Sequence, residues 1–387
     1  MRRRGDFLPF HVPSITEAEI AEVVAALREG WISSGPRVPR FEREFAEAVG
    51  APHALALNSG TAALHLALEA AGVGPGDEVI VPVMTFAATA EVVIHLGARP
   101  VFADCQPDTL LVDPAAVEAA VTERTKAIVP VHHSGQACEM DPILELARKR
   151  GPRVIEDAAH AFPASYRGRS VGSLGDAAAF SFYATKTLAA GEGGMLTAAD
   201  EALARRARIM SLHGISRGGE YRYRKEGTWR YEIEAPGYKY NMPEPQAAIG
   251  LVQLARAPEM LARRREIARR YIEGLSDVEQ LEPPVVLPER EHAWHLFVVR
   301  LRTEALPFGR DRFVEELRAR NIGASVHFIP LHRMPYYANK FGLRAGDFPN
   351  AEAAYHRIVS LPIWPGMSDA DTDDVIAAVH DTIESAS

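Results

Sequence analysis

Two patterns of apolar positions alternate along residues 53–186. Short segments with an uninterrupted apolar centre, such as DEVIVP at 77–82 and RPVFADC at 99–105, predict strands buried on both faces. Between such runs lie segments with helical spacing of apolar residues, such as TFAATAEVVIHLG at 85–97. Strands that alternate with helices in this way predict an α/β fold, with a mostly parallel central sheet and helices on both faces.

Two amphipathic helices are predicted ahead of this region. The first lies within residues 14–30 (SITEAEIAEVVAALREG), with Ser14 as its N-cap and Glu17 completing a capping box. The second lies within residues 40–50 (RFEREFAEAVG). Both are expected to pack an apolar face on the large domain.

The pattern changes towards the C-terminus, where strands and helices become shorter. We therefore predict a large α/β domain over residues 1–255, which includes the N-terminal helices, and a smaller α+β domain over residues 256–387. The polar and aromatic segment 215–236 predicts a long loop or a hairpin.

Charge and composition narrow the classes of function. The 387 residues include 43 Lys and Arg against 51 Asp and Glu, and the net charge of −8 argues against nucleic-acid binding through a basic face. No apolar run approaches the ~18 residues of a membrane span, and the basic start lacks the apolar core of a signal peptide. The two cysteines show no CxxC spacing, which argues against a disulfide scaffold or a zinc site. We expect a cytoplasmic protein with no metal, nucleic-acid or membrane partner.

Residues whose side chains could bind a ligand or take part in catalysis follow several predicted strands. They lie at the edge where the carboxyl ends of parallel strands meet. One group is the turn Asn58-Ser59-Gly60-Thr61, which leads from a strand into a helix. Free N–H groups, two hydroxyls and the positive end of a helix dipole suit a phosphate. Taken alone, the same turn is also compatible with an ordinary N-cap.

A second group lies at the end of the apolar run before Asp157, with His160 a short step further on. A buried carboxylate needs a cationic partner. A protonated heterocyclic nitrogen would supply one. The alternatives are a salt bridge to an arginine or a metal site shared with His160, although no third metal ligand stands at a sensible spacing.

A third group surrounds Lys186, which follows the Phe-Ser-Phe run containing Ser181 and precedes several glycines. An amine with a depressed pKa is nucleophilic near neutrality and forms imines with aldehydes. The alternative is a solvated surface lysine, but the glycines favour close approach of a bulky group to the backbone. Phe86, at a predicted strand-to-helix turn, would cover one face of a flat ring, although a lone aromatic residue is more often part of the core.

These groups together describe a site for pyridoxal 5'-phosphate (PLP). The coenzyme needs a phosphate cradle, an Asp at its ring nitrogen, a lysine at its aldehyde and an apolar cover for its ring. The sequence therefore predicts Lys186 as the lysine that binds the coenzyme.

The sequence also resembles, nearly from end to end, the sugar aminotransferases of the DegT/DnrJ/EryC1/StrS family. Long ordered motifs carry the resemblance: NSGTAALHLAL, GDEVIVPVMTFAATA, VIEDAAHA, GDAAAFSFYATKTLAAGEGGML and PGYKYNMPEPQAAIGLVQL. It implies the type I fold of PLP-dependent transferases. Some members are dehydratases with histidine in place of the lysine, so the retention of Lys186 implies a transaminase.

The resemblance also implies roles for individual residues. Lys186 would bind PLP and move protons, Asp157 would pair with the ring nitrogen, and His160 would lie beside the ring. Residues implied to contact the cofactor are Gly60, Thr61, Phe86, Asp157, His160, Ser181, Lys186, Lys239 and Asn241.

The segment GYKYN resembles one that a neighbouring subunit inserts into the active site, which implies a homodimer with shared sites. Family members often have Asn and Arg where this chain has Lys239 and Asn241, so either residue is a candidate for the phosphate contact. Ser33, Ser34 and His327 stand where family members line the sugar and nucleotide site. The alternatives are a simple turn for the serines and a structural strand residue for the histidine.

For the reaction, the resemblance implies L-glutamate as amino donor and a nucleotide-linked keto-sugar as acceptor. The chain is most similar to members that aminate C4 of a 4-keto-6-deoxy or pentose sugar. The expected substrate is a dTDP-linked 4-keto-6-deoxy sugar, for a secondary metabolite or a surface glycan. A 3-keto-sugar or cyclitol aminotransferase would share every catalytic residue. A PLP-dependent desulfurase would need a mobile cysteine, whereas Cys105 and Cys138 precede the lysine at strand ends. A PLP-binding regulator would need a DNA-binding part, of which the sequence shows no sign.

Overall fold

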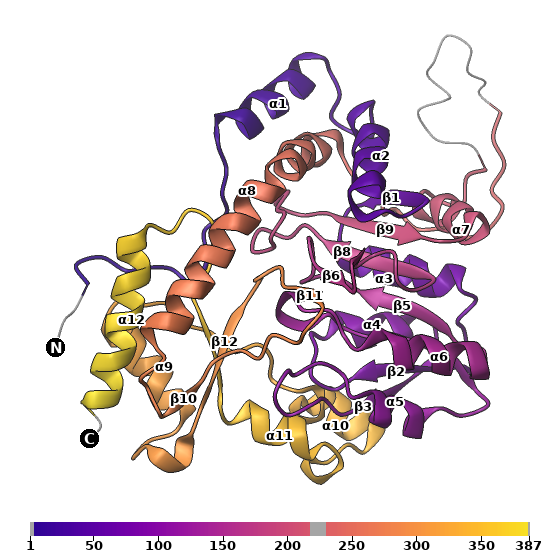
Figure 1. Cartoon of the computed structure of the whole chain (residues 1–387). Helices are drawn as coiled ribbons and strands as arrows, with labels where there is room; N and C mark the ends of the chain where they lie inside the picture. The colour runs from indigo at the N-terminus through magenta and orange to yellow at the C-terminus, as the bar shows by residue number, and fades with distance from the viewer. Residues whose placement is uncertain (1–3, 217–229, 386–387) are drawn as a thin grey trace.

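A seven-stranded sheet forms the centre of the protein in the computed structural model, which describes residues 4–216 and 230–385 (Figure 1). Its strands are β1 (His53–Leu57), β2 (Glu78–Pro82), β3 (Arg99–Ala103), β4 (Thr125–Ile128), β5 (Arg153–Asp157), β8 (Ala177–Ser181) and β9 (Gly194–Ala198). They follow the order β1-β9-β8-β5-β4-β2-β3. Only β9 runs against its neighbours β1 and β8. The predicted mostly parallel sheet is confirmed.

Both faces of this sheet are apolar, which explains the continuously apolar runs in the sequence. Alternate residues of one strand enter different cores: Ile155 packs with helices α3 and α4, whereas Val154 packs with α2 and α6 on the opposite face. A strand covered on both sides in this way has no solvent-facing position for polar residues.

Helices α2 (Arg37–Val49), α3 (Gly60–Ala70), α4 (Ala88–His95), α5 (Pro114–Ala120), α6 (Met140–Arg150) and α7 (Glu201–Ser211) cover these two faces. Helix α1 (Glu17–Arg28) instead packs against the long helix α8 (Glu244–Gly274). Buried side chains of α3, α4 and α7 share one core, and those of α2, α5 and α6 share the other. None of the helices in the described part of the chain is both long and apolar enough to cross a membrane.

The predicted cap of the first helix is wrong by two residues. Thr16 is the N-cap, and its N–H donates to Glu19 Oε2 (2.8 Å) in a capping box. The Ser14 carbonyl instead accepts a hydrogen bond from Gln253 Nε2 (2.8 Å). Ser14 therefore fastens the start of the helix to α8 (Glu244–Gly274), a tertiary contact that the local pattern does not reveal.

A second unit packs around α8, the long helix that crosses the molecule in Figure 1. It contains α9 (Arg310–Ala319), α10 (Pro335–Phe341), α11 (Pro349–Tyr355), α12 (Asp369–Glu384) and a sheet of β10 (Leu281–Glu282), β12 (Phe297–Leu301) and β13 (Ile358–Leu361). The predicted boundary after residue 255 falls inside α8, because its helical pattern continues without interruption there.

Two further features complete the described chain. A small sheet joins β11 (Arg290–Glu291) to β6 (Ser165–Tyr166) and β7 (Arg169–Ser170), which connects the segment before β12 to the large domain. Of the predicted long loop over 215–236, residues 217–229 lie outside the described part.

Candidate active site

The predicted catalytic residues lie along one edge of the central sheet. Asp157 is the last residue of β5 and Ser181 is the last residue of β8, and these two strands are parallel. Gly60 begins α3 just after β1, and Phe86 follows β2. Because these strands all point the same way, their carboxyl ends bring together residues that are far apart in the sequence.

Asp157 is buried and held by two hydrogen bonds. Its Oδ2 accepts from Thr89 Oγ1 (2.8 Å), and its Oδ1 accepts from the Ala159 N–H (3.2 Å). Burial raises the pKa of this carboxyl group, an effect opposed by those hydrogen bonds and by the charge of Lys186. Asp157 forms no ion pair with any described residue, so a cationic ring nitrogen would supply the charge that this site lacks.

Lys186 lies in a turn after β8 and is half-buried, with part of the side chain still open to solvent. Desolvation by the surrounding protein disfavours the charged form and lowers the pKa of the Lys186 amine to about 8. The negative charge of Asp157 opposes this shift. An amine of that pKa is partly neutral near physiological pH and therefore nucleophilic. Two of the predicted groups thus interact electrostatically at this edge of the sheet, as an imine-forming lysine and a ring-nitrogen acid require.

This lowered pKa predicts a pH dependence. Only a neutral amine attacks an aldehyde, so the rate of covalent PLP binding by the apoprotein is expected to rise with pH and to level off above about 8. Stopped-flow measurement of the visible absorbance of the adduct would follow this rate. A rate that keeps rising up to the usual lysine pKa of 10.5 would contradict the lowered value.

The predicted phosphate turn has the close packing that such a site needs. Ser59 caps α3 by accepting from the Ala62 N–H (3.0 Å). A Cβ on Gly60 would lie 2.9 Å from Ser181 Cβ, and a Cβ on Gly194 would lie 2.3 Å from the Ser59 carbonyl oxygen. Glycines therefore let the N-terminus of α3 lie against the end of the Ser181 strand.

Aromatic rings line the next part of the edge. Phe86 is 62% exposed, which is unusual for a large apolar side chain and leaves a ring face free to stack. Its centroid lies 6.0 Å from that of Phe328, which stacks on His160 at 5.6 Å. The arrangement fits a flat heterocycle that lies against Phe86.

His160 is buried among other imidazoles. Its ring centroid lies 4.3 Å from that of His295 and 5.9 Å from that of His133. Burial lowers the pKa of His160 well below the usual value, and the charge of Lys186 adds to the effect. Its Nδ1 has no hydrogen-bond partner among the described residues, so a neutral ring nitrogen is left for an added group.

His327 also belongs to this region, although it comes from the C-terminal unit. Its Nδ1 lies 2.9 Å from Ser360 Oγ, and its ring stacks on Phe10 at 5.3 Å. Burial lowers the pKa of His327 to about 3, and His133 and Lys186 contribute electrostatically. The histidine is therefore both anchored and close to the catalytic lysine.

The remaining predicted residues gather at a separate hollow of about 850 Å³. Asn241 Nδ2 donates to Ser34 Oγ (2.9 Å), which in turn donates to the Met242 carbonyl (3.1 Å). Lys239 Nζ contacts Asn241 Oδ1, and Ser33 also lines the hollow. Lys186 and Asp157 do not line this hollow.

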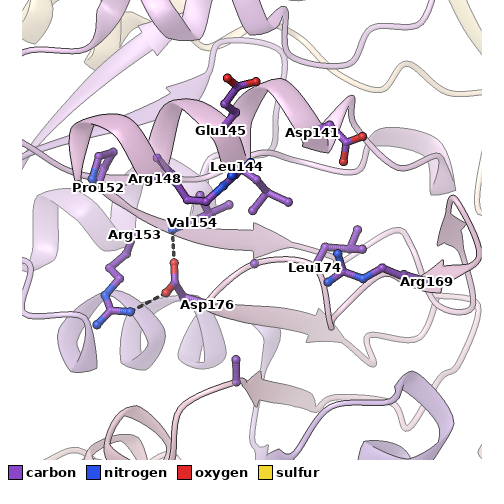
Figure 2. Close-up of a pocket in the computed structure, with 14 residues that line it drawn as sticks. Asp141, Leu144, Glu145, Arg148, Pro152, Arg153, Val154, Arg169, Leu174 and Asp176 are labelled. Atoms are coloured by element: carbon purple, nitrogen blue, oxygen red, sulfur yellow. Dashed lines mark hydrogen bonds and ion pairs between the residues drawn. The ribbon is translucent and has the colours of Figure 1, made fainter.

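Another hollow, of about 830 Å³, lies far from this chemistry (Figure 2). Arg153, the first residue of β5, lies beside it, so the hollow is at the opposite end of that strand from Asp157. Asp176, which lines this hollow, accepts hydrogen bonds from Arg153 Nη1 (2.6 Å) and from the Val154 N–H (2.8 Å), as the dashed lines in Figure 2 show. These charges serve the local structure.

Several residues near the predicted site were not predicted from the sequence. Thr89 fixes Asp157, and His133 and His295 surround His160. His11 also lies near Lys186, whose charge helps burial to lower the pKa of His11 to about 3. The motifs VHHSG and HAWHLF contain His133 and His295. Pairs of histidines next to apolar runs were the signal in the sequence that could have indicated them.

Comparison with known proteins agrees with this geometry. The profile of the DegT/DnrJ/EryC1/StrS aminotransferase family matches residues 13–380. The chain is 53% identical over 387 residues to the spore coat polysaccharide biosynthesis protein SpsC of Bacillus subtilis, with all of both chains covered.

Solved structures agree over the same length. Spr1654 of Streptococcus pneumoniae in its PMP form has a TM-score of 0.92 at 35% identity, covering 98% of this chain and 100% of that chain. DesV of S. venezuelae has a TM-score of 0.88 at 36% identity, and the match covers 97% of this chain and 99% of that chain. The chain therefore belongs to the DegT/DnrJ/EryC1/StrS aminotransferase family and is a PLP-dependent sugar aminotransferase of fold type I.

Proposed function

We propose that this enzyme transfers the amino group of L-glutamate to C4 of a 4-keto-6-deoxy sugar carried on a nucleoside diphosphate, with dTDP as the expected nucleotide. The observation that carries the catalytic part is the electrostatic interaction of the half-buried Lys186, whose amine has a pKa of about 8, with the buried Asp157. The sugar and the nucleotide are inferred from the resemblance of the sequence.

Bound PLP would supply the electron sink for amino-group transfer. In the proposed site, Asp157 keeps a proton on the ring nitrogen, and Thr89 and the Ala159 N–H hold its carboxylate in place. The Lys186 amine accepts and returns a proton at the reacting carbon, for which its lowered pKa is suited.

Other residues would bind and orient the coenzyme. Gly60 and Thr61 offer main-chain N–H groups to the phosphate, together with the Ser181 hydroxyl. Phe86 covers the ring, and the neutral His160 lies beside the ring hydroxyl. On the substrate side, His327 is assigned to the sugar because it lies close to Lys186 while remaining anchored to Ser360.

The relative SpsC favours a surface polysaccharide as the destination of the amino sugar. Its name refers to spore coat polysaccharide biosynthesis, and the match covers both chains completely. PseC of Helicobacter pylori is described as an aminotransferase of pseudoaminic acid biosynthesis and has a TM-score of 0.91 at 28% identity. We therefore favour a glycan sugar over a secondary-metabolite sugar.

A substrate panel tests the proposal. The enzyme would be incubated with L-glutamate and nucleotide-linked 4-keto and 3-keto sugars, and the products measured by mass spectrometry. We expect an amino sugar from a dTDP-4-keto-6-deoxy sugar at the highest rate. Amination of only 3-keto sugars or of a cyclitol ketone would assign the enzyme to the alternative class.

We also propose a homodimer whose active sites are shared. Ser33, Ser34, Lys239 and Asn241 line a hollow apart from Lys186. In a two-fold dimer, such a surface would complete the site of the partner. The pairing of Leu57 with Asn241 lies just before the phosphate turn, which is consistent with a cofactor role for this segment.

Mixed dimers give a clear prediction for shared sites. Lys186→Ala and the double variant Lys239→Ala/Asn241→Ala should each be inactive alone. After the subunits exchange, half of the dimers are mixed and each contains one complete site, so about a quarter of wild-type activity should return. No recovery in confirmed mixed dimers would show that each subunit uses its own Lys239 and Asn241.

A further inference from the structure

A buried carboxylate and a buried imidazole form a pair directly behind the catalytic strand end. Glu156 precedes Asp157 on β5, so its side chain enters the opposite face of the sheet. Glu156 and His132 are both 0% exposed, and His132 Nε2 lies 3.0 Å from Glu156 Oε2. Neither residue can touch coenzyme or substrate, so any contribution to catalysis acts through other residues.

Glu156 has all its acceptor positions occupied. Its Oε1 accepts from the N–H groups of Leu174 (2.9 Å) and Gly175 (2.8 Å), and its Oε2 accepts from the Gly172 N–H (3.1 Å) as well as from His132. Four donors compensate the desolvation of a buried carboxylate. Glu156 therefore ties the end of β5 to the loop that leads into β8.

That loop approaches closely because it contains glycines. Gly172 has a φ of +98°, and a Cβ there would lie 2.4 Å from Phe180 Cζ. A Cβ on Gly175 would lie 2.6 Å from the Val154 carbonyl oxygen. The local sequence is thus adapted to bring main-chain donors to Glu156.

The contacts of His132 identify its tautomer. The Cys138 N–H donates to His132 Nδ1 (3.0 Å), which leaves Nε2 as the ring nitrogen that donates to Glu156. The main chain of His132 also reaches the catalytic residue, because its N–H donates to the Asp157 carbonyl (3.0 Å). One residue therefore binds Glu156 with its ring and Asp157 with its backbone.

The end of β5 needs such a support on this side. Its neighbour β4 ends at Ile128, and the following segment is irregular, with Ser134 at a φ of 60°. Only an isolated bridge between Val131 and Asp157 continues the pairing. A short irregular segment is a weaker support than a continuous ladder, so side-chain contacts must fix its position.

We propose that the His132–Glu156 pair positions Asp157, by locking the end of β5 so that the Asp157 carboxylate faces the ring nitrogen of PLP. The inference rests on the proposed role of Asp157. His132 and Glu156 are positioning residues in this account, and their loss should disturb the coenzyme through Asp157.

Two substitutions of His132 separate its two ring contacts. Asparagine places an acceptor near the position of Nδ1 and so keeps the Cys138 contact, but loses the donor to Glu156. Glutamine extends a donor towards Glu156. In the holoenzyme, His132→Asn should lower kcat by about tenfold, the order found for residues that hold a reactive group in place, and leave KM for the sugar nucleotide unchanged. His132→Gln should restore most of kcat.

The absorbance of bound PLP gives a readout besides activity. The visible absorbance band of bound PLP changes with pH. The midpoint of this pH titration depends on the charge held at the ring nitrogen. His132→Asn should shift this midpoint in the same direction as Asp157→Asn, by a smaller amount, and Glu156→Asp should do the same. His380→Asn serves as a matched control, because its half-buried imidazole contacts the Gly274 carbonyl (2.9 Å) and Asp277 Oδ1 (3.6 Å) and no residue of the proposed site. It should match wild type.

The outcomes distinguish the two proposals. A lower melting temperature in His132→Asn and Glu156→Asp, with unchanged midpoint and kcat, would overturn the positioning role and leave a structural one. Failure of His132→Asn, His132→Gln and Glu156→Asp to fold would also overturn the positioning role, because the pair would then be needed for folding. An unchanged midpoint in Asp157→Asn would instead refute the proposed role of Asp157 itself.

Discussion

Lys186→Ala is expected to abolish transamination, lowering kcat by ~10⁴-fold or more, because both the imine-forming amine and the proton carrier are lost. The fold should remain intact. The amine is held where its pKa falls to about 8, so its environment disfavours the charged form and its removal relieves an unfavourable desolvation. Steady-state assays with glutamate and the keto-sugar, together with circular dichroism, would measure both effects.

A matched control separates this effect from the loss of any lysine. Lys149 is exposed and pairs with Glu145 on α6 (2.7 Å), away from the catalytic edge. Lys149→Ala should therefore keep wild-type kcat. Substantial transamination by Lys186→Ala would contradict the assignment of the catalytic amine.

Asp157→Asn is expected to lower kcat by ~10²–10³-fold while PLP stays bound, because the amide cannot balance a positive charge on the ring nitrogen. The substitution preserves the shape of the side chain and its hydrogen bond with Thr89. PLP affinity should fall less than kcat, since the phosphate cradle and Phe86 are unchanged. Equilibrium dialysis and steady-state kinetics would give the two values.

Glu145→Gln is the control for this variant, because it makes the same carboxylate-to-amide change on the exposed face of α6 near the hollow of Figure 2. It should leave kcat unchanged. Normal turnover by Asp157→Asn would show that this carboxylate does not act on the ring nitrogen.

The layered architecture was predictable because it depends on local pattern. Runs such as 79–82 (VIVP) are apolar at every position, and the structure buries both faces of these strands. The cap of the first helix was not predictable, since both Ser14 and Thr16 are followed by Glu three residues later. The choice between them depends on the contact of Ser14 with Gln253, more than two hundred residues away.

The same distinction applies to the site. Gly60, Asp157 and Ser181 follow strand ends, and a parallel sheet brings such ends together once the fold class is known. The histidines around His160 come from different places: His133 follows β4, and His295 precedes β12 in the C-terminal unit. Their meeting depends on how that unit packs, which no local pattern encodes.

The buried pair behind Asp157 shows a further limit of the sequence. Glu156 looks like a second candidate acid, since it stands beside Asp157 in the same motif. Strand geometry sends the two side chains to opposite faces, and the four donors around Glu156 come from His132 and a loop that follows the strand. Register and tertiary contacts therefore divide the roles of two adjacent carboxylates.

The central claim is that the amine of Lys186 binds PLP beside Asp157. Borohydride reduction of the holoenzyme would make this bond permanent, and peptide mapping by mass spectrometry would locate it. We expect a single reduced adduct, on the peptide that contains Lys186. An adduct on another lysine, such as Lys239, or a holoenzyme whose visible band is not bleached by borohydride, would contradict it.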